Sequence, residues 1–258
     1  MKPRIAVVKF ASCDGCQLQF LNAEDELLSL AAQVDFARFQ EARSRERAGP
    51  YDITFVEGSI TTPEDAQRIV RVREESRYLV TIGACATAGG VQALRNWADV
   101  EAYKRVVYPS PEFIATLSTS TPISEHVRVD FELWGCPIDK TQLLAVVRSL
   151  LSGATPSLPA HSVCLECKRR GHVCVVVARG EPCLGPVTRT GCGALCPGLD
   201  RGCYGCFGPA DDPNMTSFAQ LLTIQGLRAE EVTRRVRGIN GYVAPWRETG
   251  DAVERQTH

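Results

Sequence analysis

The chain has 258 residues, of which 44% are hydrophobic and 23% charged, and its net charge is −1. This length is enough for one large domain or two smaller ones with a sizeable buried core. The charge balance gives no strong field toward nucleic acid or an anionic membrane, which argues against both as partners. We expect no membrane span, because no apolar run reaches ~18 residues. The first residues also lack the pattern of a signal peptide, so we expect a cytoplasmic protein.

Twelve cysteines are the outlying feature of the composition. Thiols stay reduced in the cytoplasm, which disfavours a disulfide framework and favours metal binding. Twelve thiols are enough for three sites of four thiolates each.

Residues 1–151 alternate the patterns of strands and helices. The apolar runs that predict strands are residues 5–10, 34–39, 53–56, 78–82 and 127–134. Apolar residues at helical spacing predict helices over 18–30 and 141–151. The segment Thr61-Thr62-Pro63-Glu64-Asp65 has the hydroxyl cap, early proline and acidic first turn that begin another helix. This alternation predicts an α/β domain with a flavodoxin-like parallel sheet of order 2-1-3-4-5.

Four cysteines stand where predicted strands end. Cys13 and Cys16 follow the first strand, Cys85 the fourth and Cys136 the fifth. The carboxyl ends of parallel strands share one edge, where ligands bind, so these thiols can converge and hold an iron–sulfur cluster. Glu57, at the end of the third strand, should lie between them. The alternative for Cys85 and Cys136 is that they are ordinary buried cysteines. Their placement at strand ends disfavours it.

Residues 152–160 are rich in proline, glycine and serine and predict a linker before a second domain over 161–258. Residues 161–209 carry eight cysteines and few apolar runs, of which only 173–178 is a candidate strand, so metal sites should organise this segment. In chain order the cysteines form two sets of four: Cys164, Cys167, Cys174 and Cys183, then Cys192, Cys196, Cys203 and Cys206. Each set fits a zinc site or an iron–sulfur cluster, and the Cys-Pro pairs at 136–137 and 196–197 favour iron–sulfur.

Residues 210–258 hold no cysteine. Their pattern predicts short amphipathic helices over 216–224 and 228–236, and a polar, mobile tail after Trp246. We assign no chemistry to this segment.

The order and spacing of several motifs resemble those of the small, electron-transferring subunit of [NiFe] hydrogenases, over about residues 4–210. In the first half the motifs are Cys13-Asp14-Gly15-Cys16, Val56-Glu57-Gly58-Ser59-Ile60, Gly83-Ala84-Cys85-Ala86-Thr87-Ala88-Gly89-Gly90 and Gly135-Cys136-Pro137. In the second half they are Pro182-Cys183-Leu184-Gly185-Pro186-Val187-Thr188, Gly191-Cys192 and Gly202-Cys203-Tyr204-Gly205-Cys206.

The resemblance implies three [4Fe-4S] clusters. The proximal cluster would use Cys13, Cys16, Cys85 and Cys136, the medial one Cys192, Cys196, Cys203 and Cys206, and the distal one Cys164, Cys167, Cys174 and Cys183. Membrane-linked relatives have a His-x-x-Cys pair at the distal cluster and only three thiolates at a three-iron medial cluster. Here Cys196 supplies a fourth medial thiolate. His161 is a rival distal ligand, because His161-Ser162-Val163-Cys164 also has the His-x-x-Cys spacing.

The resemblance places the nickel–iron centre, and with it hydrogen cleavage, in a separate large subunit. This chain would carry electrons between that centre and flavin/NAD(P)-binding, iron–sulfur diaphorase subunits that hold FAD and NAD(P). The ending Cys206-Phe207-Gly208-Pro209 looks most like the NAD(P)-linked sulfhydrogenase type (delta subunit), with the methanogen type as the alternative. Two other interpretations are a complex I-type quinone-site subunit, disfavoured because no two cysteines are adjacent, and a zinc-stapled, non-redox scaffold.

Three further groups have both a functional and a structural interpretation. Glu57 is a candidate for proton movement or a carboxylate that caps loop N–H groups. The run Lys168-Arg169-Arg170 is a candidate docking site for the acceptor subunit or a solvated face. The glycines beside the cysteines are candidate N–H donors to cluster sulfur or plain turn residues: Gly15, Gly83, Gly135 and Gly205.

Overall fold

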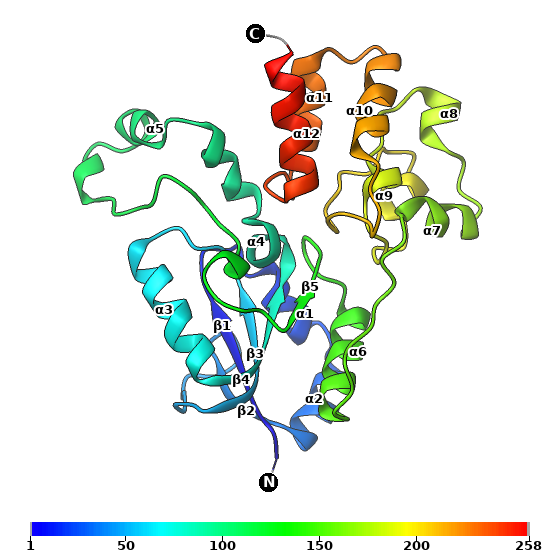
Figure 1. Cartoon of the computed structure of the whole chain (residues 1–258). Coiled ribbons are helices and arrows are strands. Elements are labelled where there is room, and N and C mark those ends of the chain that lie inside the picture. Colours follow the sequence, from blue (N-terminus) through cyan, green and yellow to red (C-terminus); the bar gives the residue numbers. More distant parts are fainter. Residues whose placement is uncertain (1, 257–258) are drawn as a thin grey trace.

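A five-stranded parallel sheet forms the centre of the first half of the chain (Figure 1). The computed structural model describes residues 2–256. The strands are β1 (Arg4–Lys9), β2 (Asp35–Phe39), β3 (Tyr51–Glu57), β4 (Ser76–Ile82) and β5 (Phe131–Leu133). Their order is β2-β1-β3-β4-β5, which confirms the predicted flavodoxin-like sheet.

Helices and short 3₁₀ turns connect and cover these strands. The α-helices are α1 (Gly15–Leu21), α2 (Asp25–Gln33), α3 (Pro63–Glu74), α4 (Gly83–Ala88), α5 (Val100–Val107), α6 (Lys140–Leu151), α7 (Val163–Arg169), α8 (Val175–Arg179), α9 (Leu195–Gly198), α10 (Met215–Ile224), α11 (Ala229–Val236) and α12 (Ala244–Arg255). The 3₁₀ helices are η1 (Val91–Trp97), η2 (Pro111–Phe113), η3 (Ile123–Glu125) and η4 (Gly185–Val187).

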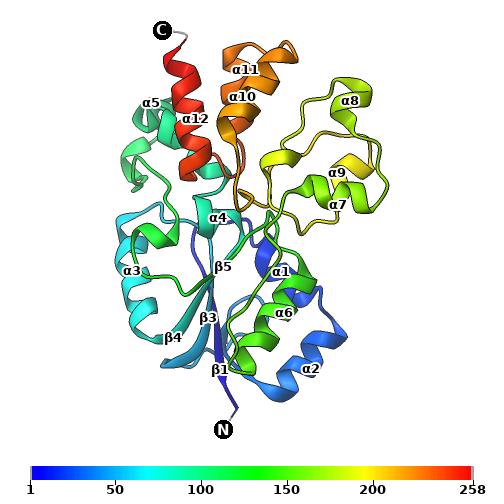
Figure 2. The same cartoon turned by 45° about the vertical axis from the view of Figure 1, so that its right-hand side comes forward.

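Both faces of the sheet are covered, so its central strands are mostly apolar. Ile5 and Val7 of β1 point to one face, where they join the core cluster formed with α1, α2 and α6. Ala6 and Val8 point to the other face, into the cluster formed with α3 and α4. Figure 2 shows α6 and α2 on one side of the sheet and α3 on the other.

The predicted helix over 18–30 is two helices. The chain turns between α1 and α2, and Glu24 has a φ of +45°. The apolar spacing was misleading because Leu18 and Leu28 face solvent, being 45% and 70% exposed. The core instead takes Phe20 and Leu30, at 1% and 6% exposure.

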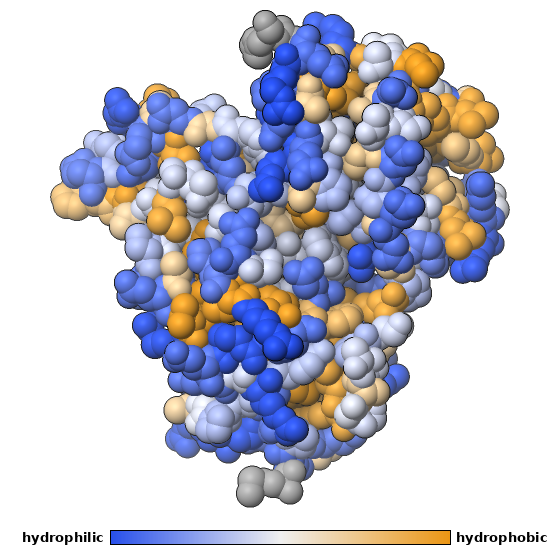
Figure 3. Space-filling view, in the orientation of Figure 1, coloured by the Kyte–Doolittle hydropathy of each residue, from blue (hydrophilic) through white to orange (hydrophobic). Residues whose placement is uncertain are grey.

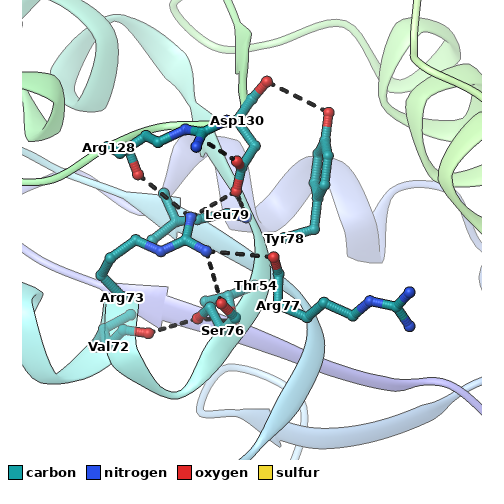
Figure 4. A network of polar contacts seen from close by, with 9 residues as sticks. All are labelled: Thr54, Val72, Arg73, Ser76, Arg77, Tyr78, Leu79, Arg128 and Asp130. Atoms are coloured by element: carbon teal, nitrogen blue, oxygen red, sulfur yellow. Dashed lines mark hydrogen bonds and ion pairs between the residues drawn. The ribbon is translucent and has the colours of Figure 1, made fainter.

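Arg73, in the last turn of α3, ties β4 to the segment before β5 (Figure 4). Its guanidinium contacts Asp130 Oδ2 at 2.5 Å and donates to the Ser76 carbonyl at 2.7 Å. Asp130 Oδ2 also accepts the Leu79 N–H at 2.8 Å. The Asp130 N–H donates to the Leu79 carbonyl at 2.9 Å, but a side chain satisfies the Leu79 N–H, so the regular pairing of the two strands begins only at residue 131. The last strand is therefore shorter than the predicted 127–134.

The candidate strand over 173–178 is instead the single-turn helix α8. Among residues 2–256, the only sheet is the one formed by β1 to β5, and an unpaired strand here would leave its backbone groups unsatisfied. The helical turn satisfies them locally, with the Ala178 N–H bonded to the Cys174 carbonyl at 2.9 Å. Only Val175 is buried, while Val173 and Val177 are 66% and 86% exposed.

The segment predicted to be a mobile tail contains the helix α12. Pro245 lies in its first turn, where the missing N–H costs nothing. Trp246 is fully buried in a cluster with α10, α11 and η4. The two other predicted helices of this segment are confirmed as α10 and α11.

The C-terminal helices are fixed to the α/β half through η1. The Arg237 guanidinium lies over the Trp97 ring, 4.8 Å from its centroid, and bonds to Asp251 at 2.6 Å. Trp97 Nε1 donates to the same carboxylate at 3.1 Å. Within residues 2–256, no helix is long and apolar enough to cross a membrane.

Candidate metal centres

The carboxyl edge of the sheet brings Cys13, Cys16, Cys85 and Cys136 together. The α1 turn that carries Cys16 follows β1, and α4, which carries Cys85, begins directly after β4. The Ala84 N–H donates to the Gly135 carbonyl at 2.8 Å, which joins the Cys85 and Cys136 loops. The four thiols are close enough to repel one another as anions. Charge on Cys85 and Cys136 raises the pKa of Cys16, after burial, and charge on Cys13 does the same for Cys136.

Glycines make room for these sulfurs. A Cβ at Gly83, where φ is +84°, would overlap the Cys16 sulfur. A Cβ at Gly15 would lie 3.4 Å from Cys13 Sγ. At Gly83 the backbone therefore reaches the sulfur at a distance that another residue could not match, whereas at Gly15 a Cβ would be in ordinary contact.

Burial makes these thiols poor acids in the absence of a cation. It raises the pKa of Cys16 well above the ordinary thiol range and that of Cys85 to about 11. A bound metal supplies the positive charge that converts such thiols to thiolates. The donor set and its electrostatics therefore fit a metal group.

Glu57 lies at the end of β3, between the cysteine loops, and is 1% exposed. Its Oε1 accepts the Cys16 N–H at 3.0 Å, so the carboxylate does cap a loop that carries a candidate ligand. Its Oε2 has no hydrogen-bond partner within residues 2–256. Burial raises the pKa of this carboxyl, which favours its protonated form at the site.

The eight remaining cysteines lie in two neighbouring groups. After burial, charge on Cys183, Cys167 and Cys174, in that order, raises the pKa of Cys164 to about 11. In this first group Cys164 and Cys167 lie on α7, Cys174 lies directly before α8 and Cys183 lies after it.

The second group has Cys196 at its centre. Burial and then charge on Cys192 raise the pKa of Cys196. The pKa of Cys206 rises to about 12 through burial and then charge on Cys192, Cys136 and Cys196. Charge on Cys183, a member of the first set, is the next cause after Cys192 for Cys196, so the division of the eight thiols into these two sets stays a prediction.

Contacts between the sets arrange them in a line. Charge on Cys136 is one of the causes that raise the pKa of Cys206, so the second group lies next to the set at the sheet edge. The Cys203 N–H donates to Cys183 Sγ at 3.1 Å, so the second group also touches the first. The order in space is therefore the sheet-edge set, then the set containing Cys196, then the set on α7 and α8.

Backbone N–H groups point at sulfur in the cysteine-rich half. Cys183 Sγ accepts from Gly185 at 3.4 Å as well as from Cys203, and Cys203 Sγ accepts from Gly205 at 3.4 Å. Such bonds favour a thiolate over a thiol. Gly205 is thus both an N–H donor and, at a φ of +78°, a turn residue.

The C-terminal helices form one wall of the middle set, a role that the sequence analysis missed. The Trp246 ring packs so closely on Gly205 that a Cβ there would overlap it. Asn240 Nδ2 donates to the Gly205 carbonyl at 2.8 Å. Trp134, just before Cys136, packs in the same way on Gly208. In the sequence, the one signal for this role of the C-terminal helices is a tryptophan in an otherwise polar tail.

His161 and His172 both lie in the cysteine-rich half of the chain, and a ligand role for His161 stays a prediction. His161 lines a hollow of about 490 Å³ between α6 and α7, together with Gln142 and Glu166. The ring of His172 lies against Gly198, where a Cβ would come within 2.9 Å of it.

The thiol sets are not closed around single ions. Among residues 2–256, no three His, Cys, Asp or Glu side chains are placed to hold one metal ion. Four thiolates around zinc would have sulfurs about 3.8 Å apart. A four-iron cluster instead holds each thiolate on a separate iron, with the sulfurs further apart.

Comparison with known proteins gives one family and several relatives. A profile described as NADH ubiquinone oxidoreductase, 20 kDa subunit, matches residues 13–150. The chain is 36% identical to the sulfhydrogenase 2 subunit delta of Pyrococcus furiosus, over 91% of this chain and 98% of that protein. It is 28% identical to a subunit of the F420-non-reducing hydrogenase of Methanocaldococcus jannaschii, over 94% and 95% of the two chains.

A solved structure shares both sequence and fold with this chain. It is the crystal structure of an NAD+-reducing [NiFe]-hydrogenase in the H2-reduced state. The match has a TM-score of 0.57 and 32% identity, and it covers 62% of this chain and 96% of the other.

Proposed function

Because the chain belongs to the NADH ubiquinone oxidoreductase 20 kDa subunit family, and within it to the hydrogenase small subunits, we propose that it is the electron-relay subunit of a [NiFe] hydrogenase. Relatives over nearly the whole chain are hydrogenase subunits, which favours this function over that of a complex I-type quinone-site subunit. We place the hydrogen-cleaving nickel–iron centre in a large partner subunit.

The observation that supports this proposal best is the linear order of the three thiol sets. We assign the set at the sheet edge to a proximal cluster, the set containing Cys196 to a medial cluster and the set on α7 and α8 to a distal cluster. When bound, each [4Fe-4S] cluster would accept and pass on one electron at a time. The electrostatic interaction of Cys136 with Cys206 and the hydrogen bond from the Cys203 N–H to Cys183 Sγ would then lie at the two transfer steps.

The chain's own residues would hold and tune this path. The backbone N–H groups that donate to the sulfurs of Cys183 and Cys203 stabilise negative charge on these sulfurs. They therefore favour reduction of a bound cluster. Glu57, buried and with one oxygen free of hydrogen bonds within residues 2–256, is our candidate for holding a proton near the proximal set. We keep residues 1–151 and 161–258 as the two proposed domains.

We place the acceptor subunit at the distal set, around α7 and α8. Cys174 is exposed there, beside Val173 and Val177 and the basic run Lys168-Arg169-Arg170. Figure 3 shows apolar side chains at this outer edge of the cysteine-rich half. An apolar centre with a basic rim suits a partner with an acidic rim. A flavin- and NAD(P)-binding diaphorase is our proposed acceptor, with a methanogen-type acceptor as the alternative.

We also propose a cytoplasmic location, because thiols stay reduced there.

Anaerobic purification with native partners tests the relay function. We expect about twelve iron and twelve sulfide per chain, from three four-iron clusters, and nickel on a larger co-purifying chain. Hydrogen-dependent reduction of NAD or NADP by the same preparation would identify the acceptor type. Two or three zinc per chain, with little iron and no nickel-bearing partner, would instead establish a zinc-stapled scaffold.

Cys196→Ser tests the division of the eight C-terminal thiols. Among the neighbouring thiols, Cys192 is the one whose charge raises the pKa of Cys196 most. We therefore expect only the medial paramagnetic signal to change or vanish. Iron should fall by about one to four per chain. Cys174→Ser is the matched control and should affect only the distal signal. An unchanged medial signal with a lost distal one in Cys196→Ser would show that the two sets are divided differently.

A further inference from the structure

A buried polar network lies directly behind Cys85, on residues to which the relay function assigns no role. Ser59 and Ser120 are fully buried, and their hydroxyls are 2.9 Å apart. Ser120 Oγ donates to the Gly89 carbonyl at 3.1 Å. Gln92, on η1, closes the network on the side of the cysteine.

The hydrogen bonds of Gln92 fix the orientation of its amide. Its Nε2 donates to the Ala11 carbonyl at 2.8 Å and to Ser59 Oγ at 2.9 Å. Its Oε1 accepts a hydrogen bond from the Cys85 thiol, with Oε1 and Sγ 3.7 Å apart. A carbonyl oxygen can only accept a hydrogen bond. Turning the amide over would therefore press Oε1 against the Ala11 oxygen, so the carbonyl end stays toward the sulfur.

Gly90 makes this approach possible. A Cβ at this position would lie 2.7 Å from Cys85 Sγ and 2.8 Å from Gln92 Oε1, closer than real Cβ atoms come. Gly90 also has a φ of +68°, which favours glycine. The close contact between the amide oxygen and the sulfur is therefore built into the loop.

We propose that Gln92 is a positioning residue that lowers the reduction potential of the proximal cluster, by holding the negative end of its amide dipole against the Cys85 sulfur. The proposal rests on the relay function above. As a cluster ligand, Cys85 has no S–H to donate, so Oε1 faces a negatively charged sulfur. The Ser59 and Ser120 hydroxyls behind the amide are fully buried, and an oxygen held against the sulfur opposes the arrival of an electron. Electrostatic surroundings of this kind set cluster potentials.

Gln92→Met in the intact hydrogenase complex tests the proposal, because methionine fills similar space without the amide dipole. A redox titration monitored by paramagnetic resonance would follow the proximal signal, with the medial and distal signals as internal references. We expect the proximal potential to rise and the other two to stay in place. Gln92→Leu should give the same upward shift and serves if the methionine variant does not fold.

Asn96→Ala is the matched control. Asn96 bonds Ser120 through Nδ2 at 2.9 Å and Oδ1 at 2.7 Å, so its loss weakens the same network without removing the dipole at the sulfur. This variant should be less stable but keep the wild-type proximal potential. A proximal potential that stays or falls in both Gln92 variants would overturn the proposal. Absence of iron–sulfur signals in the wild-type complex would refute the relay function instead.

Discussion

Replacing Trp246 by alanine is expected to lower the free energy of unfolding by about 3–5 kcal/mol, the usual cost of removing a large buried aromatic side chain. Trp246 is fully buried in the cluster of the three C-terminal helices. Its ring also forms the wall against Gly205, in the loop that holds Cys203 and Cys206. We therefore expect the medial cluster to be lost as well, with iron falling from about twelve to about eight per chain.

Urea unfolding and iron analysis of the same preparation would measure both effects. Ile224→Ala is the control, because Ile224 is 82% exposed on the neighbouring helix α10. It should change stability by less than about 0.5 kcal/mol and leave iron unchanged. If Trp246→Ala were destabilised but kept all its iron, Trp246 would be a core residue alone, with no role in supporting the thiol loop.

The sheet and the cysteines at its edge could be predicted because their signals are local. Strands buried on both faces give continuous apolar runs such as residues 53–56. The turn that follows each strand marks one shared edge, which places Cys85 and Cys136 near Cys16 without knowledge of any contact. The same logic located Glu57 at the end of β3, next to the Cys16 N–H.

The parts that could not be predicted depend on contacts between segments distant in sequence. The run 173–178 has strand-forming residues, but within the part of the chain that the structure describes the only sheet is that of β1 to β5, and the run forms a helical turn. Trp246 belongs to a polar segment, and only its contact with Gly205 shows what it does. Residues 83–126 fold into short turns and helices with little apolar periodicity, so Gln92 carried no signal of its own.

The proximal set is most directly tested by Gly83→Ala. Gly83 has a φ of +84°, where a side chain costs about 1–2 kcal/mol. Its methyl group would also overlap the Cys16 sulfur. Cys16 cannot easily move aside, because Phe20 anchors α1 in the core at 1% exposure. We expect loss of the proximal cluster, about four fewer iron per chain, and loss of hydrogen-dependent dye reduction.

Gly153→Ala separates this effect from backbone strain. Gly153 has a similar φ of +75°, but no atom lies within 4 Å of the position of its added Cβ. It should therefore lose only about 1–2 kcal/mol of stability and keep its iron and activity. If Gly83→Ala behaved like Gly153→Ala, the Cys16 sulfur could not lie against Gly83 in the assembled enzyme. A difference between two glycines of like conformation would instead be due to that sulfur, because the backbone cost is the same at both.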